Sequence, residues 1–384
     1  MQGGDLQRLR RLNALSSINA LRTAGQPLTL SELATATGLS RGSIGDVVGE
    51  LQTRGWVAEV EPAPGAMGRP ARRYRFRADV GHVLGVDIGV NKVLATVTDL
   101  DGHALASGRT AVGAGTDTAT RLAAVTRATE AALYAAGLTQ SAIWAVTAGT
   151  FGVVDRKGAV ARVEAVPSWT GVDLVGHLCA AFTCPVLVEN DSKLAALAEQ
   201  RLGVASGVRD LVYLLAGRRP GAALIVNGAL HHGFSGYTGE VGLLDVTGWR
   251  TMSERLERLG VASGAHPEDA AAQVFAAARN GEAAARAAIE EYAADLALGT
   301  AAMVLTLDPE LVVLGGGFSR SGDVLLEPLR RALEPHCLRV PDIRLSNLGE
   351  ECVVLGAACL AIDHLNGRFF SPDHEIAPPR APLR

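Results

Sequence analysis

The stretch Leu84–Gly102, which reads LGVDIGVNKVLATVTDLDG, decides how the rest of the chain is interpreted. Val, Ile, Leu and Thr gather on both sides of a polar turn, and such runs bounded by Gly and Asp predict a pair of adjacent strands. Gly89 lets the backbone approach closely, and Asp87 can face a phosphorylated ligand, a sugar phosphate or a metal-bound water. An Asp-x-Gly turn can also be purely structural, so its meaning depends on its surroundings.

The chain has room for two or three domains, because it contains 384 residues of which 48% are hydrophobic. No apolar run reaches the roughly 20 residues that a membrane-spanning helix needs, and the N-terminus lacks a signal-peptide pattern. An odd number of cysteines in mostly apolar segments suits buried thiols in a reducing compartment. The sequence therefore predicts a cytoplasmic protein without a membrane partner. The cysteines are Cys179, Cys184, Cys337, Cys352 and Cys359.

Charge is unevenly distributed along the chain. Residues 1–78 contain eleven arginines and six acidic residues, a balance of +5, so the remaining residues must carry −9 to give the net charge of −4. A basic first fifth on an acidic body predicts a separate module that binds a polyanion.

The basic segment has the spacing of a helix-turn-helix. Leu6–Leu21 carries apolar residues at helical spacing. In Ser31–Leu51, which reads SELATATGLSRGSIGDVVGEL, Gly38 falls at the turn and apolar residues fall where the two helices would meet. Ser31 and Ser40 are the expected N-caps. The segment predicts a DNA-binding helix-turn-helix, and the alternative is an ordinary helical hairpin.

Two β segments, Trp56–Glu61 and Arg73–Phe76, flank a stretch rich in Pro and Gly and so predict a wing. An arginine of Gly68-Arg69-Pro70 can enter a narrow minor groove while its neighbours contact phosphates. The alternative is a basic hairpin that only faces solvent.

The second helix of the pair would read the major groove, because Ile44, Val47 and Leu51 face inward. Its three glycines each cost up to about 1 kcal/mol of helix propensity and offer no side chain to DNA. We therefore expect few direct base contacts, and a decayed DNA-binding function stays open. The residues predicted to contact DNA are Ser40, Arg41, Ser43, Asp46, Arg69, Arg72 and Arg73.

From Val80 onward, strands alternate with helices, which predicts an α/β body of two lobes with a cleft between them. Asn190 and Asp191 follow a short apolar strand and begin a helix. Such side chains can grip sugar hydroxyls, and Asp191 can act as a general base, but either can equally be a helix cap. The turn Gly315–Gly317 suits close contact with a nucleotide or a tight strand-to-helix connection.

Together these motifs resemble the ROK family of repressors, open reading frames and sugar kinases. The resemblance covers nearly the whole chain and rests on Asp87–Gly89, Glu189–Asp191, Gly239–Gly242, Gly315–Gly317 and Val354–Ala358. It implies an actin-like (ribonuclease H-like) two-lobed ATPase fold, preceded here by the winged helix-turn-helix.

The resemblance also assigns roles. It implies that Asn190, Asp191 and Glu240 bind a sugar and that Asp191 matches the base of the family's kinases. The kinases have a second phosphate loop that resembles GTGIG, whereas this chain has Gly217-Arg218-Arg219-Pro220-Gly221. Arg219 is bulky and Pro220 has no N–H to donate, so the loop argues against kinase activity without excluding it. Asp191 would then be a vestigial base.

The family's zinc site is expected to be absent. In its members a His follows the segment that matches Gly239–Gly242, and a cysteine cluster comes after it. Here Leu243 takes the His position, and no cysteine lies between Cys184 and Cys337. Without thiolate or imidazole ligands we expect no structural zinc. That histidine also helps to hold the sugar in relatives, so its loss bears on the sugar site.

The sequence thus predicts a sugar-responsive, dimeric or higher-order DNA-binding regulator that uses no cofactor. The expected parts are a winged head at 1–80, a sugar-kinase-like body at 81–370 and a flexible tail at 371–384. The enzyme alternative is an ATP-dependent, glucokinase-like sugar kinase. A third alternative is a regulator that answers to a protein partner or a modification.

Overall fold

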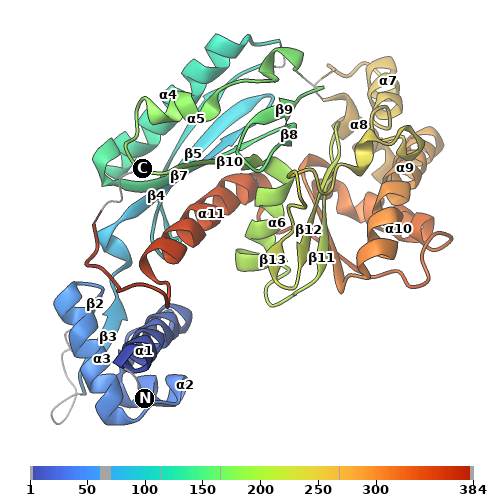
Figure 1. Ribbon diagram of the computed structural model, residues 1–384. Helices are drawn as coiled ribbons and strands as arrows, with labels where there is room; N and C mark the ends of the chain where they lie inside the picture. Colours follow the sequence, from blue (N-terminus) through green and yellow to red (C-terminus); the bar gives the residue numbers. More distant parts are fainter. Residues whose placement is uncertain (1–2, 61–70, 114, 165, 268, 381–384) are drawn as a thin grey trace.

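A computed structural model describes residues 3–60, 71–113, 115–164, 166–267 and 269–380 of the chain. Figure 1 shows a small head at the lower left, formed by the N-terminal segment, and two lobes that each contain a sheet. The long helix α11 (Cys352–Phe369) runs through the middle of the molecule. The helical head and the two-lobed α/β body expected from the sequence are both present.

The head has the topology of a winged helix domain. Three helices pack with a small sheet of strand order β1-β3-β2, whose first strand lies between the first two helices and in which both pairs are antiparallel. The side chains of Ile44, Val47 and Leu51 are buried, which confirms the predicted inner face of the second helix of the pair. The elements are α1 (Gly3–Ala24), β1 (Leu28–Thr29), α2 (Leu30–Thr37), α3 (Arg41–Arg54), β2 (Val57–Val60) and β3 (Arg73–Phe76).

The caps of these helices partly correct the sequence prediction. Ser40 caps α3 as expected, because its hydroxyl accepts the N–H of Ser43. Helix α2, however, begins after Thr29 and not after Ser31. The Thr29 hydroxyl accepts the N–H of Glu32, and the Glu32 carboxylate accepts the N–H of Thr29. This reciprocal pair satisfies two donors at the helix start, whereas a cap at Ser31 would satisfy at most one.

Each lobe is built around one five-stranded sheet, and the two sheets share a pattern. In each sheet the first three strands form an antiparallel meander, a later strand pairs with the first in parallel, and a further strand pairs in parallel with that later one. The lobe-one order is β10-β7-β4-β5-β6, and the lobe-two order is β13-β12-β11-β14-β15. Parallel strands need helical crossovers, so helices cover the faces of both sheets.

The elements of lobe one are β4 (His82–Ile88), β5 (Lys92–Asp99), β6 (Ala104–Ala111), α4 (Thr118–Ala136), β7 (Ile143–Thr150), β8 (Val153–Val154), β9 (Val160–Arg162), α5 (Leu174–Cys179) and β10 (Val186–Asn190). Helix α6 (Asp191–Leu202) connects the lobes. Those of lobe two are β11 (Leu211–Leu215), β12 (Gly221–Val226), β13 (Ala229–Leu230), α7 (Glu254–Ala262), α8 (Ala270–Arg279), α9 (Ala283–Leu307), β14 (Leu311–Gly315), α10 (Gly322–Leu333) and β15 (Asp342–Leu345).

Helices α6 and α11 cross at the centre of the body. Within the described residues, the segment 349–369 is the one stretch with the length and mean hydropathy, 1.2, of a membrane-crossing helix. It packs against α6, β4, β5 and β7, which is the position of a core helix. At the crossing, a Cβ atom added to Gly356 would lie 1.8 Å from the carbonyl oxygen of Leu194 on α6. Only glycine permits this approach.

Replacing Gly356 with alanine should therefore destabilise the body. Because backbone atoms must move to admit the methyl group, we expect a loss of about 1–3 kcal/mol or more in the free energy of unfolding. Gly367→Ala is the matched control on the same helix, since a Cβ there meets nothing within 4 Å. Chemical denaturation of both variants provides the comparison, and equal stability would contradict the tight crossing.

Head and body share one continuous hydrophobic core. Trp56, which follows α3, is fully buried and lies against Phe76 of the head. Its ring also contacts Phe369 and Phe370 at the end of α11, with centroid distances of 5.4 and 4.7 Å. Trp144 of lobe one completes the cluster. The head is therefore packed onto the body and is not carried on a free linker.

The C-terminal tail departs from the expectation of a loose segment. Residues 371–380 contain no helix or strand, but Ile376 is only 4% exposed. The indole N–H of Trp56 donates to the carbonyl oxygen of Ala377 at 2.7 Å. Arg54, the last residue of α3, binds the Glu375 carboxylate and the carbonyl oxygen of Ile376. The tail over 371–380 is thus fixed against the head, and 381–384 lie outside the described residues.

Candidate sugar and DNA sites

The predicted pair Asn190 and Asp191 lies where β10 passes into α6. Asn190 caps the helix, since its side-chain oxygen accepts the N–H of Lys193 at 3.2 Å. The same side chain donates to the carbonyl oxygen of Gly152 and to Asp191. One Asp191 oxygen also accepts the N–H of Ser192 at 2.7 Å. The capping alternative is confirmed for Asn190, and the cap orients its amide beside the Asp191 carboxylate.

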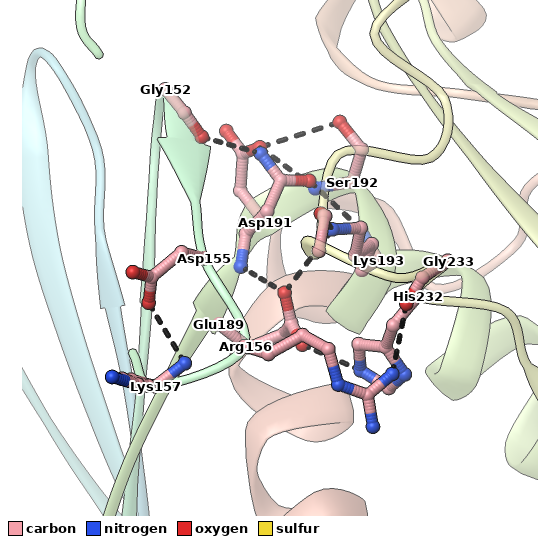
Figure 2. A network of polar contacts seen from close by, with 12 residues as sticks. Gly152, Asp155, Arg156, Lys157, Glu189, Asp191, Ser192, Lys193, His232 and Gly233 are labelled. Atoms are coloured by element: carbon pink, nitrogen blue, oxygen red, sulfur yellow. Dashed lines mark hydrogen bonds and ion pairs between the residues drawn. The ribbon is translucent and has the colours of Figure 1, made fainter. Parts of the chain in front are cut away.

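A buried charged group adjoins this pair, and it includes Glu189, to which the sequence analysis gave no role of its own. Glu189 is 7% exposed, and its carboxylate contacts His232 Nε2 at 2.8 Å and Lys193 Nζ at 3.6 Å. Lys193 is 1% exposed and also donates to the carbonyl oxygen of Gly236 (Figure 2). Charged groups are buried only when they are paired. This group fixes the strand-to-helix turn against a loop of lobe two.

That loop reaches the hairpin β8–β9 of lobe one. Arg156 donates to the carbonyl oxygen of Gly233 at 2.9 Å, a contact that Figure 2 shows right of its centre. Gly236 lies so close to the hairpin that an added Cβ would be 2.9 Å from the carbonyl oxygen of Val154. The loop leads to Glu240, so all three predicted sugar residues lie where the lobes meet.

Three carboxyl groups near this junction have raised pKa values. Burial, together with the charge of Asp191, raises the pKa of Asp87 to about 7, against the opposing effect of Lys92. Burial likewise raises the pKa of Asp191 to about 6. It raises that of Glu240 to about 7, against the opposing charge of Lys193. A group of desolvated acids suits hydroxyl-rich ligands, to which each acid can donate or from which it can accept.

The second glycine loop does not offer a free row of N–H donors. The N–H of Gly217 donates to the Tyr292 hydroxyl, and that hydroxyl donates to the carbonyl oxygen of Gly217. Arg218 turns towards Glu257, at 3.3 Å, while Arg219 is exposed. Since the Gly217 N–H is engaged and Pro220 has no N–H, the loop offers fewer backbone donors to a nucleotide phosphate than a glycine-rich loop would.

The residues after Glu240 do not fit the family's zinc ion. Leu243 stands at the position of the histidine ligand. Trp249 is 3% exposed, packs against Gly242 and Gly299, and donates its indole N–H to Asp295. An apolar indole offers no ligand to zinc. In the part of the chain that the structure describes, no three His, Cys, Asp or Glu residues are grouped so that they could hold a metal.

The residues predicted to read the major groove lie on the outer side of α3. Arg41, Ser43 and Asp46 are exposed, and the Ser40 hydroxyl caps the helix while it contacts the Ser43 hydroxyl at 2.9 Å. This is the arrangement expected of a recognition helix, whose N-terminal residues contact base edges.

The predicted wing arginines are partly engaged within the head. Arg72 pairs with Glu59 at 3.3 Å. Arg73 pairs with Glu32 at 3.2 Å and donates to the carbonyl oxygen of Pro27. Both side chains are about half exposed, so these pairs are weak and can exchange for phosphates. Arg69 lies outside the described residues.

A buried arginine supports the turn that follows β4 at Gly89 and Val90, and the sequence analysis missed it. Arg121 on α4 is fully buried and donates to the carbonyl oxygens of Gly89, Val90 and Gly113. Its guanidinium lies over the ring of Phe151, at 5.5 Å from the centroid. Burial without a carboxylate partner lowers its pKa. Arg121 is one of two arginines in this Ala-rich helix, and that was the available signal, but its partners come from distant turns.

A winged helix-turn-helix head packed onto two actin-like lobes, with sugar-kinase residues where the lobes meet, defines a class of DNA-binding proteins built on a kinase fold. Comparison with known families agrees. The pattern of the ROK family matches residues 83–254 and 250–364, and the IclR helix-turn-helix domain matches residues 12–61. Because the ROK match covers more than half of the chain, the protein belongs to the ROK family.

Similar proteins include both regulators and kinases. The chain is 23% identical to a xylose repressor of Caldicellulosiruptor bescii, over 93% of this chain and 97% of that protein. It is 29% identical to a glucokinase of Halalkalibacterium halodurans, over 50% of this chain and 68% of that protein.

Among solved structures, a ROK family transcriptional regulator homologous to the E. coli MLC protein shares the fold, with a TM-score of 0.71 and 20% identity over 93% of this chain and 97% of that chain. A Streptomyces griseus ROK glucokinase in complex with glucose and AMPPNP matches 74% of this chain and all of that chain, with 25% identity and a TM-score of 0.60. The full-length matches thus have regulators' names, and this kinase structure matches only part of this chain.

Proposed function

We propose that this protein is a transcriptional repressor whose affinity for operator DNA changes when a sugar binds between the two lobes. The observation that carries the proposal is the shared core of head and body, because Trp56 of the head packs against both α11 and lobe one. A movement of the lobes would then move the recognition helix. The loss of N–H donors in the loop Gly217–Gly221 supports a body that binds a ligand and does not phosphorylate it.

In this mechanism the sugar hydroxyls are held by Asn190, Asp191 and Glu240, and the protein acts in the cytoplasm as a homodimer or larger assembly. Sugar closes the lobes, α11 transmits the change to the head, and the spacing of two recognition helices changes. A ligand shifts such an equilibrium only by its difference in affinity for the two states. The dimer would match an operator with two half-sites, about one helical turn apart.

The test is selection of genomic DNA fragments by the purified full-length protein at near-physiological salt, since low salt favours non-specific binding. We expect enrichment of a palindrome, and release of that DNA by at least one sugar in a panel. Enrichment of no sequence, with or without sugars, would contradict the proposal. If the protein binds a specific DNA sequence but no sugar changes that binding, the DNA-binding role is supported and the sugar is not the signal.

Arg41→Ala should weaken binding to the selected operator. Arg41 is exposed at the first turn of α3, where an arginine contact to a base is worth about 1–3 kcal/mol, roughly a tenfold to hundredfold change in Kd. Arg127→Ala is the control, because Arg127 is an exposed arginine on α4 of the body. Fluorescence anisotropy with operator and scrambled DNA separates the cases. If both variants bind equally well, α3 is not the recognition helix.

The alternative function, an ATP-dependent sugar kinase, is favoured by one observation. Asp191 is retained at the lobe junction, and its pKa of about 6 suits a general base near neutral pH. The assay is ADP production with a sugar panel. ADP production by wild type that is lost in Asp191→Ala would show that the protein is a sugar kinase and would contradict a body that only binds a ligand.

A further inference from the structure

One carboxylate, outside the predicted site, binds three cations beside the lobe junction. Glu350 contacts Lys92 Nζ at 2.6 Å, Arg320 Nη2 at 2.6 Å and Arg109 Nη1 at 3.3 Å. We call these four residues the Glu350 corner. Lys92 and Arg109 belong to strands β5 and β6 of lobe one, whereas Arg320 belongs to lobe two. The cations of the two lobes thus meet on a single carboxylate.

The corner lies next to the two turns that suit phosphate contact. Lys92 follows the turn of Asp87 and Gly89, and its carbonyl oxygen accepts the N–H of Gly89. Arg320 follows the glycine turn after β14. The charges of Lys92, Glu350 and Asp191 all act on buried Asp87, so the corner and the sugar residues are electrostatic neighbours.

Glu350 has the environment that proteins give to bound phosphate. It lies two residues before the start of α11, in the short turn Gly349–Glu351, and the N-terminus of a helix favours negative charge. Three charged donors converge on it, and such donors bind carboxylate and phosphate by the same geometry. Stability alone does not account for the arrangement, because the side chains of Arg109 and Arg320 are 61% and 63% exposed and such ion pairs contribute little.

We propose that the Glu350 corner is an anion site occupied by the protein's own carboxylate, and that Glu350 thereby restricts the ligand to uncharged sugars and excludes sugar phosphates. While Glu350 neutralises the three cations, an incoming phosphate meets Asp87, Asp191 and Glu350 without a free positive charge. Removing the Glu350 charge would leave Lys92, Arg109 and Arg320 to bind a phosphoryl group.

The test compares full-length wild type, Glu350→Gln and Glu351→Gln. Glu351 is the exposed neighbour of Glu350, so its variant makes the same charge change outside the corner. The probe is inorganic pyrophosphate without magnesium, at an ionic strength matched with sodium chloride, and the readouts are Tm and calorimetric Kd. We expect Glu350→Gln to bind pyrophosphate at least tenfold more tightly than wild type and Glu351→Gln. The double variant Glu350→Gln with Arg320→Gln should lose this gain.

The proposal is overturned if wild type binds pyrophosphate as tightly as Glu350→Gln, or if Glu350→Gln gains no affinity. Should that variant fail to fold, the wild-type titration still decides, because tight pyrophosphate binding by wild type contradicts an occupied corner.

The sugar part of the inference rests on the proposed function, and it is tested separately with neutral sugars and their 6-phosphates. A sugar phosphate that stabilises wild type would overturn the exclusion but leave a sugar-responsive regulator intact. If Glu350→Gln gains affinity for pyrophosphate but no sugar binds to the protein, the occupied anion site is supported and the sugar-responsive regulator is contradicted.

Discussion

Asp191→Asn should abolish sugar binding and at the same time raise the Tm of the free protein at pH 8. In the folded protein the pKa of Asp191 is raised from 3.8 to about 6, chiefly by burial, so ionising this group opposes folding. Since one pKa unit corresponds to about 1.4 kcal/mol, the asparagine can recover up to about 3 kcal/mol at pH 8. Below the unfolded pKa the carboxyl is protonated in both states, so the gain should vanish.

Proton binding determines whether stability rises or falls with pH. Between about pH 4 and pH 7, the folded protein holds protons on Asp87, Asp191 and Glu240 that the unfolded chain releases. The contribution of these three groups to wild-type stability should therefore fall as the pH rises through this range and then level off. Thermal unfolding of wild type and Asp191→Asn from pH 4 to pH 8 measures both effects.

Glu130→Gln on α4 is the control, because it removes an exposed carboxylate. A stabilisation by Asp191→Asn that is the same at pH 4 and pH 8 would show that desolvation of the charge is not its cause. Retention of sugar binding by Asp191→Asn would show that the ligand does not use this carboxylate.

The sequence predicted the parts of the fold whose signals are local. The hairpin of β4 and β5, the recognition helix and the strand-to-helix turn at Asn190 each have an apolar pattern and a bounding glycine or cap within a few residues. The capping box of α2 was also readable, since Thr29 and Glu32 have the required spacing. Helix α9 gave no amphipathic signal because apolar residues occur all around it, as in a helix buried on several sides.

Contacts between distant segments could not be predicted. Glu189 and Lys193 are four residues apart on the chain, so their pairing was accessible, but His232 reaches them from a loop of lobe two. The tail was expected to be loose because it has four prolines and little apolar periodicity. Ile376 is nevertheless buried, and the tail is held by hydrogen bonds from Arg54 and Trp56, more than 300 positions away in the sequence.

Trp56→Ala should produce the largest loss of stability among the head variants and should uncouple the head from the body. The indole is fully buried among Phe76, Phe369 and Phe370, and such truncations cost about 3–5 kcal/mol. Trp56→Phe keeps an aromatic ring but loses the N–H that donates to the tail, so we expect a smaller loss of about 1 kcal/mol. Denaturant unfolding of both variants gives the two values.

Truncation after Phe370 tests whether the tail couples the recognition helix to the body. It removes the tail but leaves the aromatic rings around Trp56 in place. Arg54 then loses Glu375 and the Ile376 carbonyl oxygen, its contacts with the tail at the end of α3. We expect faster amide hydrogen exchange over α3 and weaker operator binding, while ligands still stabilise the body. If exchange over α3 and operator affinity both stay at their wild-type values, the tail has no part in holding the recognition helix, and coupling must pass through α11 and Trp56 alone.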